Sequence, residues 1–245
     1  MAKQGGLGQE FFAHGLQIGA DVAGIDDASS PRTFQDVTPI TLSAIERVQL
    51  KSTGRLAFTV FFNDAAGQAH GELSTLPTTD VILLWALGTA INDPAAWLVA
   101  KQVNYDLARG AGGELTIGVE GVGQARPLEW GVMLSAGIDT FANSGSKASK
   151  DDAASSAAGL AAVLALDDID SGTPTFVIED SPNDSSWSTL VSFAAVADGA
   201  EPTAERVTVS GTVNRYLRIT TTGTFTNADY AVAYRRGLST EDEAL

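Results

Sequence analysis

The sequence predicts an all-β fold with one flanking α-helix, divided between two domains. Short runs of apolar, β-branched and aromatic residues recur along the chain, separated by clusters of Gly, Pro, Asp and Ser. That spacing is typical of β-sandwiches and barrels. One window, residues 64–76, instead spaces its apolar residues as a helix does. A third stretch, residues 141–158, has almost no large apolar side chain and marks a break in the chain.

The length of 245 residues is sufficient for two domains. We expect a first domain over residues 1–142 that forms a β-sandwich or barrel, and a second over residues 158–245 that forms a β-sandwich. Residues 143–157 are rich in Ser, Ala, Gly and charge, which favours a flexible linker between the two.

Seven strands are predicted in the first domain. They cover residues 13–18, 32–37, 56–63, 81–87, 95–105, 114–121 and 128–138. The run at 81–87 is continuously apolar, which fits a strand buried on both faces. The glycines at 110–113 indicate a hairpin between residues 95–105 and 114–121. Residues 24–31 are predicted as a loop and residues 41–47 as a helical turn.

The flanking helix is predicted over residues 64–76, with Asp64 as its N-cap and Pro77 as its stop. Gly67 and Gly71 each weaken it by up to about 1 kcal/mol relative to alanine, so it should depend on packing against the sheet.

Six short strands are predicted in the second domain. They cover residues 160–166, 175–179, 188–193, 205–210, 215–221 and 229–235, with turns at 167–172, 181–185, 198–202 and 223.

The charge of the chain excludes several functions. Thirty acidic side chains against 15 basic ones give a formal net charge of -15, which repels nucleic-acid phosphates and disfavours specific DNA or RNA binding. There is no cysteine, so disulfides and thiolate chemistry are absent. Residues 1–9 are polar and Gly-rich and do not resemble a signal peptide. The longest apolar run, at 81–87, is too short to cross a membrane.

No catalytic, cofactor or metal site stands out, and we expect no enzymatic activity. His14 and His70 are interpreted as core or rim histidines that each make one hydrogen bond. The carboxylates of residues 167–170 and 179–184 could bind calcium, but they do not follow the EF-hand order, and solvated turns are the commoner case. Trp187 and Tyr216 could face a glycan or could be core aromatics of the second sandwich.

Several fragments carry a resemblance to a known family. In order they are DVTPITLSAIERVQL (36–50), RLAFTVFFNDAAGQAH (55–70), LPTTDVILLW (76–85), AAWLVAKQVNYDLARGAGGELTIGVEG (95–121) and LEWG (128–131). Together they resemble the major tail protein, or tail tube protein, of long-tailed, non-contractile bacteriophages of actinobacteria. SPNDSSWSTL (181–190) and NRYLRITTTG (214–223) are similar to galactose-binding-like sandwiches.

The resemblance implies a structural virion protein, made in the host cytoplasm, that forms stacked hexameric rings. These rings would make the tail tube through which genomic DNA passes without binding, and the second domain would decorate its outside. Other copies of the chain, the tail terminator and the tape measure protein would be its partners. Residues 1–9 and 51–55 would be candidates for contacts between rings.

The candidate site residues are therefore structural. We expect the strand side that carries Leu56, Phe58, Val60 and Phe62 to contact a neighbouring subunit, although both strand sides could be internal. Asp106, Glu114 and Glu120 are expected to line the lumen, or else to be ordinary surface carboxylates. Two other functions remain open: a tail-associated adhesin whose second domain recognises a host-surface glycan through Trp187 and Tyr216, and, ranked last, a cell-wall hydrolase.

Overall fold

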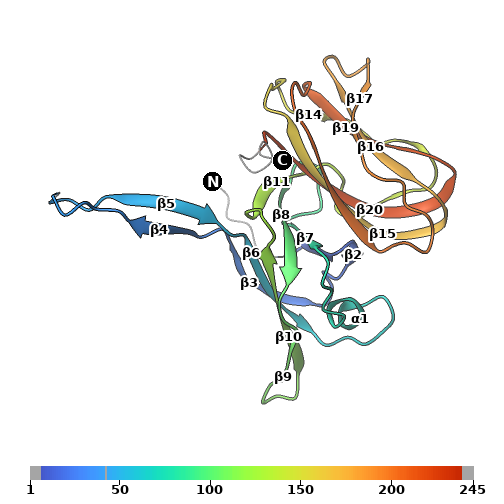
Figure 1. The fold of residues 1–245 in the computed structure, drawn as a ribbon. Helices are drawn as coiled ribbons and strands as arrows, with labels where there is room; N and C mark the ends of the chain where they lie inside the picture. Colours follow the sequence, from blue (N-terminus) through green and yellow to red (C-terminus); the bar gives the residue numbers. More distant parts are fainter. Residues whose placement is uncertain (1–6, 42, 239–245) are drawn as a thin grey trace.

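The computed structural model describes residues 7–41 and 43–238, and the fold is all-β with one short helix, as predicted (Figure 1). In the first half of the chain the elements are β1 Glu10–Ala13, β2 Leu16–Gln17, β3 Val22–Ser29, β4 Arg32–Asp36, β5 Arg47–Ser52, β6 Arg55–Phe61, α1 Ala69–Leu73, β7 Val81–Ala86, β8 Pro94–Gln102, β9 Asp106–Arg109, β10 Leu115–Gly123, β11 Glu129–Met133 and β12 Asp139–Phe141. In the second half they are β13 Gly145–Ser146, β14 Lys150–Asp151, β15 Leu160–Gly172, β16 Thr175–Ser181, β17 Ser188–Ser192, β18 Thr203–Val209, β19 Tyr216–Thr222 and β20 Phe225–Arg236.

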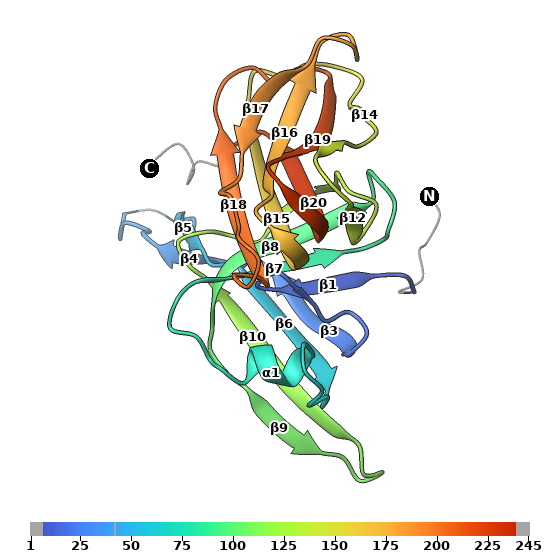
Figure 2. The same cartoon turned by 90° about the vertical axis from the view of Figure 1, so that its right-hand side faces the viewer.

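One large sheet runs through both halves of the chain. Its central path has the order β18-β15-β20-β11-β8-β10-β6-β3, with β7, β1 and β2 continuing from β8 and with β9 on β10. A second sheet holds β13 and β14 beside β19, followed by β16 and β17, and β4 pairs only with β5. Figure 2 shows the second sheet and the β9–β10 hairpin at opposite ends of the molecule.

The two halves meet within the large sheet. Val132 of β11 lies opposite Tyr234 of β20, and the Leu134 N–H donates to the Val232 carbonyl at 2.8 Å. A shared apolar cluster, which includes Phe12 and Trp97 from the first half and Val163, Ala165 and Ala231 from the second, packs across this junction. Whether each predicted domain folds alone stays a prediction, but their hydrophobic cores are in contact.

The predicted linker at residues 143–157 is part of the second sheet. Strands β13 and β14 both pair with β19, and Ser156 forms a bridge with Val213. Its short polar side chains were interpreted as flexible. A sheet edge needs only backbone N–H and C=O groups, however, so such residues can pair there. The expectation of a flexible linker is therefore corrected.

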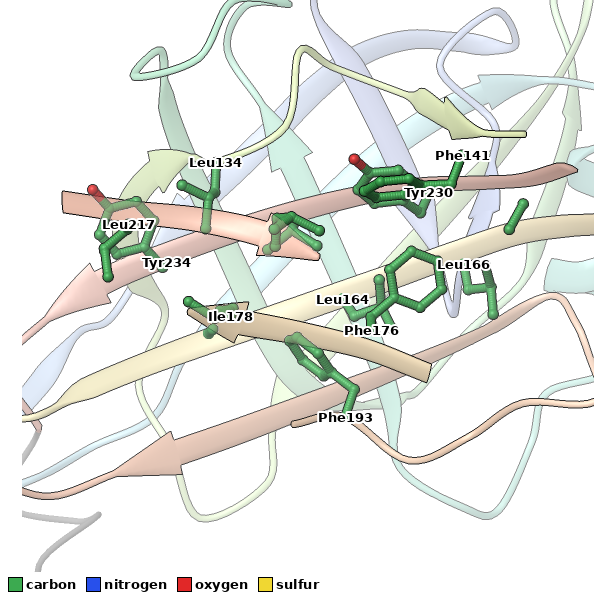
Figure 3. Close-up of a cluster of buried hydrophobic side chains, with 14 of the residues drawn as sticks. Leu134, Phe141, Leu164, Leu166, Phe176, Ile178, Phe193, Leu217, Tyr230 and Tyr234 are labelled. Carbon is green, nitrogen blue, oxygen red and sulfur yellow. The ribbon is translucent and has the colours of Figure 1, made fainter. Parts of the chain in front are cut away.

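The second-half core forms between β15 and β20 on one side and β16 and β19 on the other (Figure 3). The Phe141 and Tyr230 rings stack with centroids 5.1 Å apart, and the Phe176 and Tyr230 centroids are 4.9 Å apart. Such aromatic pairs add to the free energy of burying their apolar area. All six strands predicted here are present, although β15 continues through residues 167–172, which were predicted as a turn.

The first-half core lies between β6, β7, β8 and β10, with α1 against it. Strand β7 is buried along most of its length, as predicted. Helix α1 is shorter than predicted and buries Ala69 and Leu73. Gly67 has φ of 71°, outside the right-handed helical region, so the helix cannot extend back to Asp64.

Three further predictions in the first half are corrected. Residues 24–31 contain most of β3, because Asp26 occupies a β-bulge rather than a turn. Residues 13–18 form a hairpin that turns at His14, with φ of 50°, and Gly15. Residues 41–47 carry no helix among the described residues; they close the β4–β5 hairpin, and residue 42 lies outside the described part.

The hairpin predicted between residues 95–105 and 114–121 forms instead between β9 and β10, and this prediction is corrected. Strand β10 pairs with β9 across the 110–113 turn, and it meets β8 only at Gly121, Val122 and Gly123.

Candidate assembly surfaces

Strands β3 and β9 of the large sheet have one open edge each, and β18, at the other end of the central path, has one as well. Strand β3 pairs with β6, strand β9 pairs with β10, and neither has a second strand partner among the described residues. An open edge presents backbone N–H and C=O groups to any strand of matching length. The sheet β3–β6–β10–β9 therefore ends on both sides in backbone that can accept another chain.

The outward face of this sheet is rich in carboxylates. Asp106 lies opposite Gly118, and Glu120 is two residues further along β10, so both side chains point to the same face. Asp26 joins this face, since its carboxylate accepts a hydrogen bond from the Thr59 hydroxyl at 2.8 Å. Two of the three predicted lumen residues, Asp106 and Glu120, are thus brought together.

Arg55 partly neutralises this carboxylate face. Its guanidinium donates to Glu120 at 2.6 and 3.0 Å and lies 3.4 Å from Asp27. The hydrogen bond to Glu120 raises the pKa of Arg55. Four carboxylates (Asp26, Asp27, Asp106 and Glu120) and one guanidinium leave the face negative overall.

Glu114 lies apart from this face. It is exposed and follows the turn at 110–113, where its carbonyl accepts the Gly110 N–H at 2.8 Å. Its place at the tip of the β9–β10 hairpin still exposes it to a neighbouring molecule, but it does not share the row formed by Asp106 and Glu120.

The predicted interface residues lie mostly inside the chain. Leu56, Phe58 and Val60 have no exposed surface and belong to the first-half core. Phe62 is half-buried, with its ring 4.8 Å from that of His70. The interface assignment is corrected for Leu56, Phe58 and Val60, because the first-half core covers these side chains, and it stays a prediction for Phe62. Phe61, on the other side, is 50% exposed.

An apolar arm was missed by the sequence analysis. Strands β4 and β5 form a ribbon that extends away from the body (Figure 1). Its exposed large apolar side chains are Phe34, Val37, Ile40, Ile45, Val48 and Leu50. An isolated two-stranded ribbon is marginally stable in water, and exposed apolar groups on this scale mark an interaction surface. The signal in the sequence was the alternation of Val48 and Leu50 with polar residues over 47–52.

Trp187 and Tyr216 lie near the outer face of the second sheet, and neither belongs to an apolar cluster of the core. The Arg218 guanidinium lies 4.1 Å from the Trp187 ring centroid, and that of Arg215 lies 5.0 Å from Tyr216. One face of each ring is thus covered by a cation of the same chain, which leaves less aromatic surface for a sugar.

A buried ion network connects the two halves of the chain. Glu129 of β11, with 2% of its side chain exposed, accepts hydrogen bonds from Arg206 of β18 at 2.5 and 2.8 Å. It also accepts the Trp97 indole N–H at 3.0 Å and lies 3.1 Å from Arg235. Its burial and its three partners make this carboxylate a structural group.

The remaining polar candidates are also structural. His70 Nδ1 lies 2.6 Å from the Tyr105 hydroxyl, as expected for a rim histidine, while His14 Nδ1 is buried without a hydrogen-bond partner. Asp167 accepts the Gln17 N–H at 2.6 Å, and burial raises its pKa. In the part of the chain that the structure describes, no cluster of three or more His, Asp or Glu is placed to hold a metal ion. No helix in that part is long and apolar enough to span a bilayer.

Comparison with known proteins gives two structural likenesses. No family model matches the chain, and no curated protein matches it. The Dit protein of phage SPP1, called a paradigm of the hub adsorption apparatus in phages that infect Gram-positive bacteria, covers 93% of this chain and 99% of its own, at 9% identity and a TM-score of 0.36. The match to the baseplate of phage P2, in its activated conformation with Ca, covers 94% of this chain and 98% of the baseplate chain, at 10% identity and a TM-score of 0.27. Likenesses of this degree carry no conclusion about what this chain does.

Proposed function

We propose that this chain is a structural protein of a bacteriophage tail that closes into a ring with copies of itself, and that it is not an enzyme. The observation that carries the proposal is the pair of open edges on the sheet β3–β6–β10–β9. If β9 of one copy pairs with β3 of the next, the sheets join into one closed barrel. Such a contact is heterologous, and it forms a ring when the rotation between copies closes.

The negative face fits the inner wall of such a ring. Asp26, Asp106 and Glu120 would face a central channel. A wall of like charge repels the phosphates of DNA and lets the polymer pass without arrest. The resemblance of residues 36–131 to tail tube proteins is the second support, and it implies six copies in each ring and stacking of the rings.

The apolar arm would connect copies in this assembly. Its residues 32–51 hold three of the 15 basic but only two of the 30 acidic side chains. The arm is therefore slightly positive while the rest of the chain is strongly negative. Electrostatic attraction favours contact of the arm with the body of another copy, and burial of its apolar side chains would stabilise that contact.

Negative-stain electron microscopy and sedimentation velocity of the purified chain test the proposal. We expect rings or short tubes roughly 100 Å wide, as estimated from six compact units around a duplex-sized channel. Single rings without stacks would support ring closure and reject the tube. A chain that stays monomeric at every concentration and ionic strength would overturn the proposal.

Variants at the two edges test the contact itself. Ala23→Lys on β3 and Ala108→Lys on β9 place a charge at exposed positions of the open edges, and edge lysines prevent strand pairing. Each variant should keep the monomer folded and abolish rings. Ala195→Lys, in an exposed loop of the second half, is the matched control. Rings in both edge variants would show that the subunits meet elsewhere.

A further inference from the structure

A cleft opens where the two halves of the chain meet. It is a shallow, open depression of about 410 Å³, and its floor is formed by β11 and β20. Trp130, Asn92 and Lys150 are among its lining residues, together with Asp152 and Tyr234. The volume falls in the range of roughly 300–1,000 Å³ that is typical of small-molecule sites. The cleft is separate from the open edges of β3 and β9 and from the apolar arm.

Trp130 supplies an aromatic surface to this cleft. It is 50% exposed although it lies on a central strand of the large sheet. Trp85 of β7 and Trp130 of β11 both lie opposite Ala96 of β8, which runs between them, and their ring centroids are 6.3 Å apart. Trp85 therefore supports the indole from one side, and the rest of the ring is left open. The first-half and shared core clusters do not include Trp130.

Asn92 supplies a polar group with free hydrogen-bonding capacity. Its backbone N–H donates to the Met133 carbonyl at 2.9 Å, which fixes the loop beside β11. Its side chain is exposed and has no hydrogen-bond partner among the described residues. A side-chain amide offers both donors and an acceptor, so it can recognise a hydroxyl group in either role.

Lys150 and Asp152 form a fixed polar wall of the cleft. The Lys150 ammonium pairs with Asp152 and lies 5.3 Å from the Tyr234 ring centroid. Asp152 also accepts hydrogen bonds from the Tyr234 hydroxyl at 2.7 Å and from Arg236 at 2.5 Å. Burial works against the charged form of Asp152, but these donors hold its pKa below the usual value. Lys150 and Arg236 share Asp152, and Arg235, which also lines the cleft, lies 3.1 Å from Glu129. The wall therefore presents fixed hydrogen-bond donors to a polar ligand.

We propose that this cleft binds a saccharide ring, stacked on Trp130 and hydrogen-bonded by Asn92. A sugar ring has an apolar C–H face and a hydroxyl-bearing edge, and the cleft places an aromatic face beside donors and acceptors in the same way. Nucleotides also stack on aromatic rings. Their phosphates, however, would approach a chain of net charge -15. The site goes beyond ring assembly, which needs no ligand.

Titration of the full chain with free monosaccharides tests the proposal. The probes are neutral hexoses, 6-deoxyhexoses and N-acetylhexosamines, with isothermal calorimetry and tryptophan emission as readouts. Trp130→Ala should weaken binding of the responding sugar at least roughly tenfold, because the stacking surface is lost. Trp130→Phe keeps a ring and should retain most of the affinity. Asn92→Ala should weaken binding about threefold to tenfold through the lost hydrogen bond.

Phe61→Ala is the matched control, since it removes an aromatic side chain that is 50% exposed, like Trp130, but lies outside the cleft, and it should leave the affinity unchanged. No saturable response to any sugar at roughly 10 mM would overturn the proposal. Equal affinities in Trp130→Ala and the wild-type chain would do the same. Burial of Trp130 on self-association without sugar would show that this surface is a contact between copies, and would also reject the proposal.

Discussion

Strand β15 and the apolar arm differ in both sequence and surroundings: residues 160–166 of β15 are continuously apolar, whereas apolar and polar residues alternate along β5. The first seven residues of β15 are buried, because β18 and β20 flank the strand and the second sheet packs on it. Every residue of β4 and nearly every residue of β5 is exposed. A continuous apolar run predicts a strand covered on both faces, and an alternating pattern predicts one covered face, but the neighbouring elements decide whether that face is covered within the same chain. Apolar side chains that no element of the same chain covers are available to another molecule.

The largest effect is expected at the buried Glu129, where the two halves of the chain meet. Glu129→Ala leaves Arg206 and Arg235 without their buried carboxylate. We expect the free energy of unfolding to fall by about 3–5 kcal/mol, as for a buried charge that loses its partner. Urea denaturation measures it. Glu120→Ala removes a carboxylate whose partner Arg55 is 47% exposed, and should lower the free energy of unfolding far less. Similar losses in both variants would show that the network is not important for stability.

The comparison itself is tested by one leucine from each region. Leu164 of β15 is 2% exposed and Leu50 of β5 is 43% exposed. Leu164→Ala should lower the free energy of unfolding by about 2–5 kcal/mol, since it removes packed methyl groups and leaves a cavity. Leu50→Ala should change it by no more than about 0.5 kcal/mol in the monomer. A large loss in Leu50→Ala at low protein concentration would show that the arm packs within its own chain.

The arm should affect association more than stability. In the double variant Phe34→Ser with Ile45→Ser, two exposed apolar side chains of the arm are replaced by polar ones. We expect self-association to weaken at least roughly tenfold, measured by sedimentation velocity. The monomer should unfold at the same urea concentration as the wild type. Unchanged association would mean that the arm contacts something other than a second copy.

The smallest effect is a change in acid sensitivity at the edge of the second sheet. Hydrogen bonds from Arg215 and from the Ala153 N–H lower the pKa of Asp151 from 3.8 to about 2. A lowered folded pKa stabilises the fold above pH 3.8, and this contribution is lost as the pH falls toward 2. In Asp151→Asn the fall in stability between pH 4 and pH 2 should be shallower. Asp198→Asn, at an exposed loop residue, serves as the control.

Local patterns predicted the strands but not the contacts between distant segments. Asp106 and Glu120 share a face because the β9–β10 hairpin sets their register over a few residues. Glu129 and Arg206 are 77 positions apart, and no local signal indicates that they meet. The residues of β3 were missed because Asp and Ser are typical of turns, whereas Asp26 sits in a bulge. The exposed Trp130 could not be distinguished from a core aromatic residue in the sequence.

The pairing of β11 with β20 has a mechanical consequence. Because the backbone hydrogen bonds of the large sheet continue from one half into the other, the chain has no hinge at that point. A rotation of one half against the other would have to break the β11–β20 pairing at Val132 and Met133 and expose the shared apolar cluster.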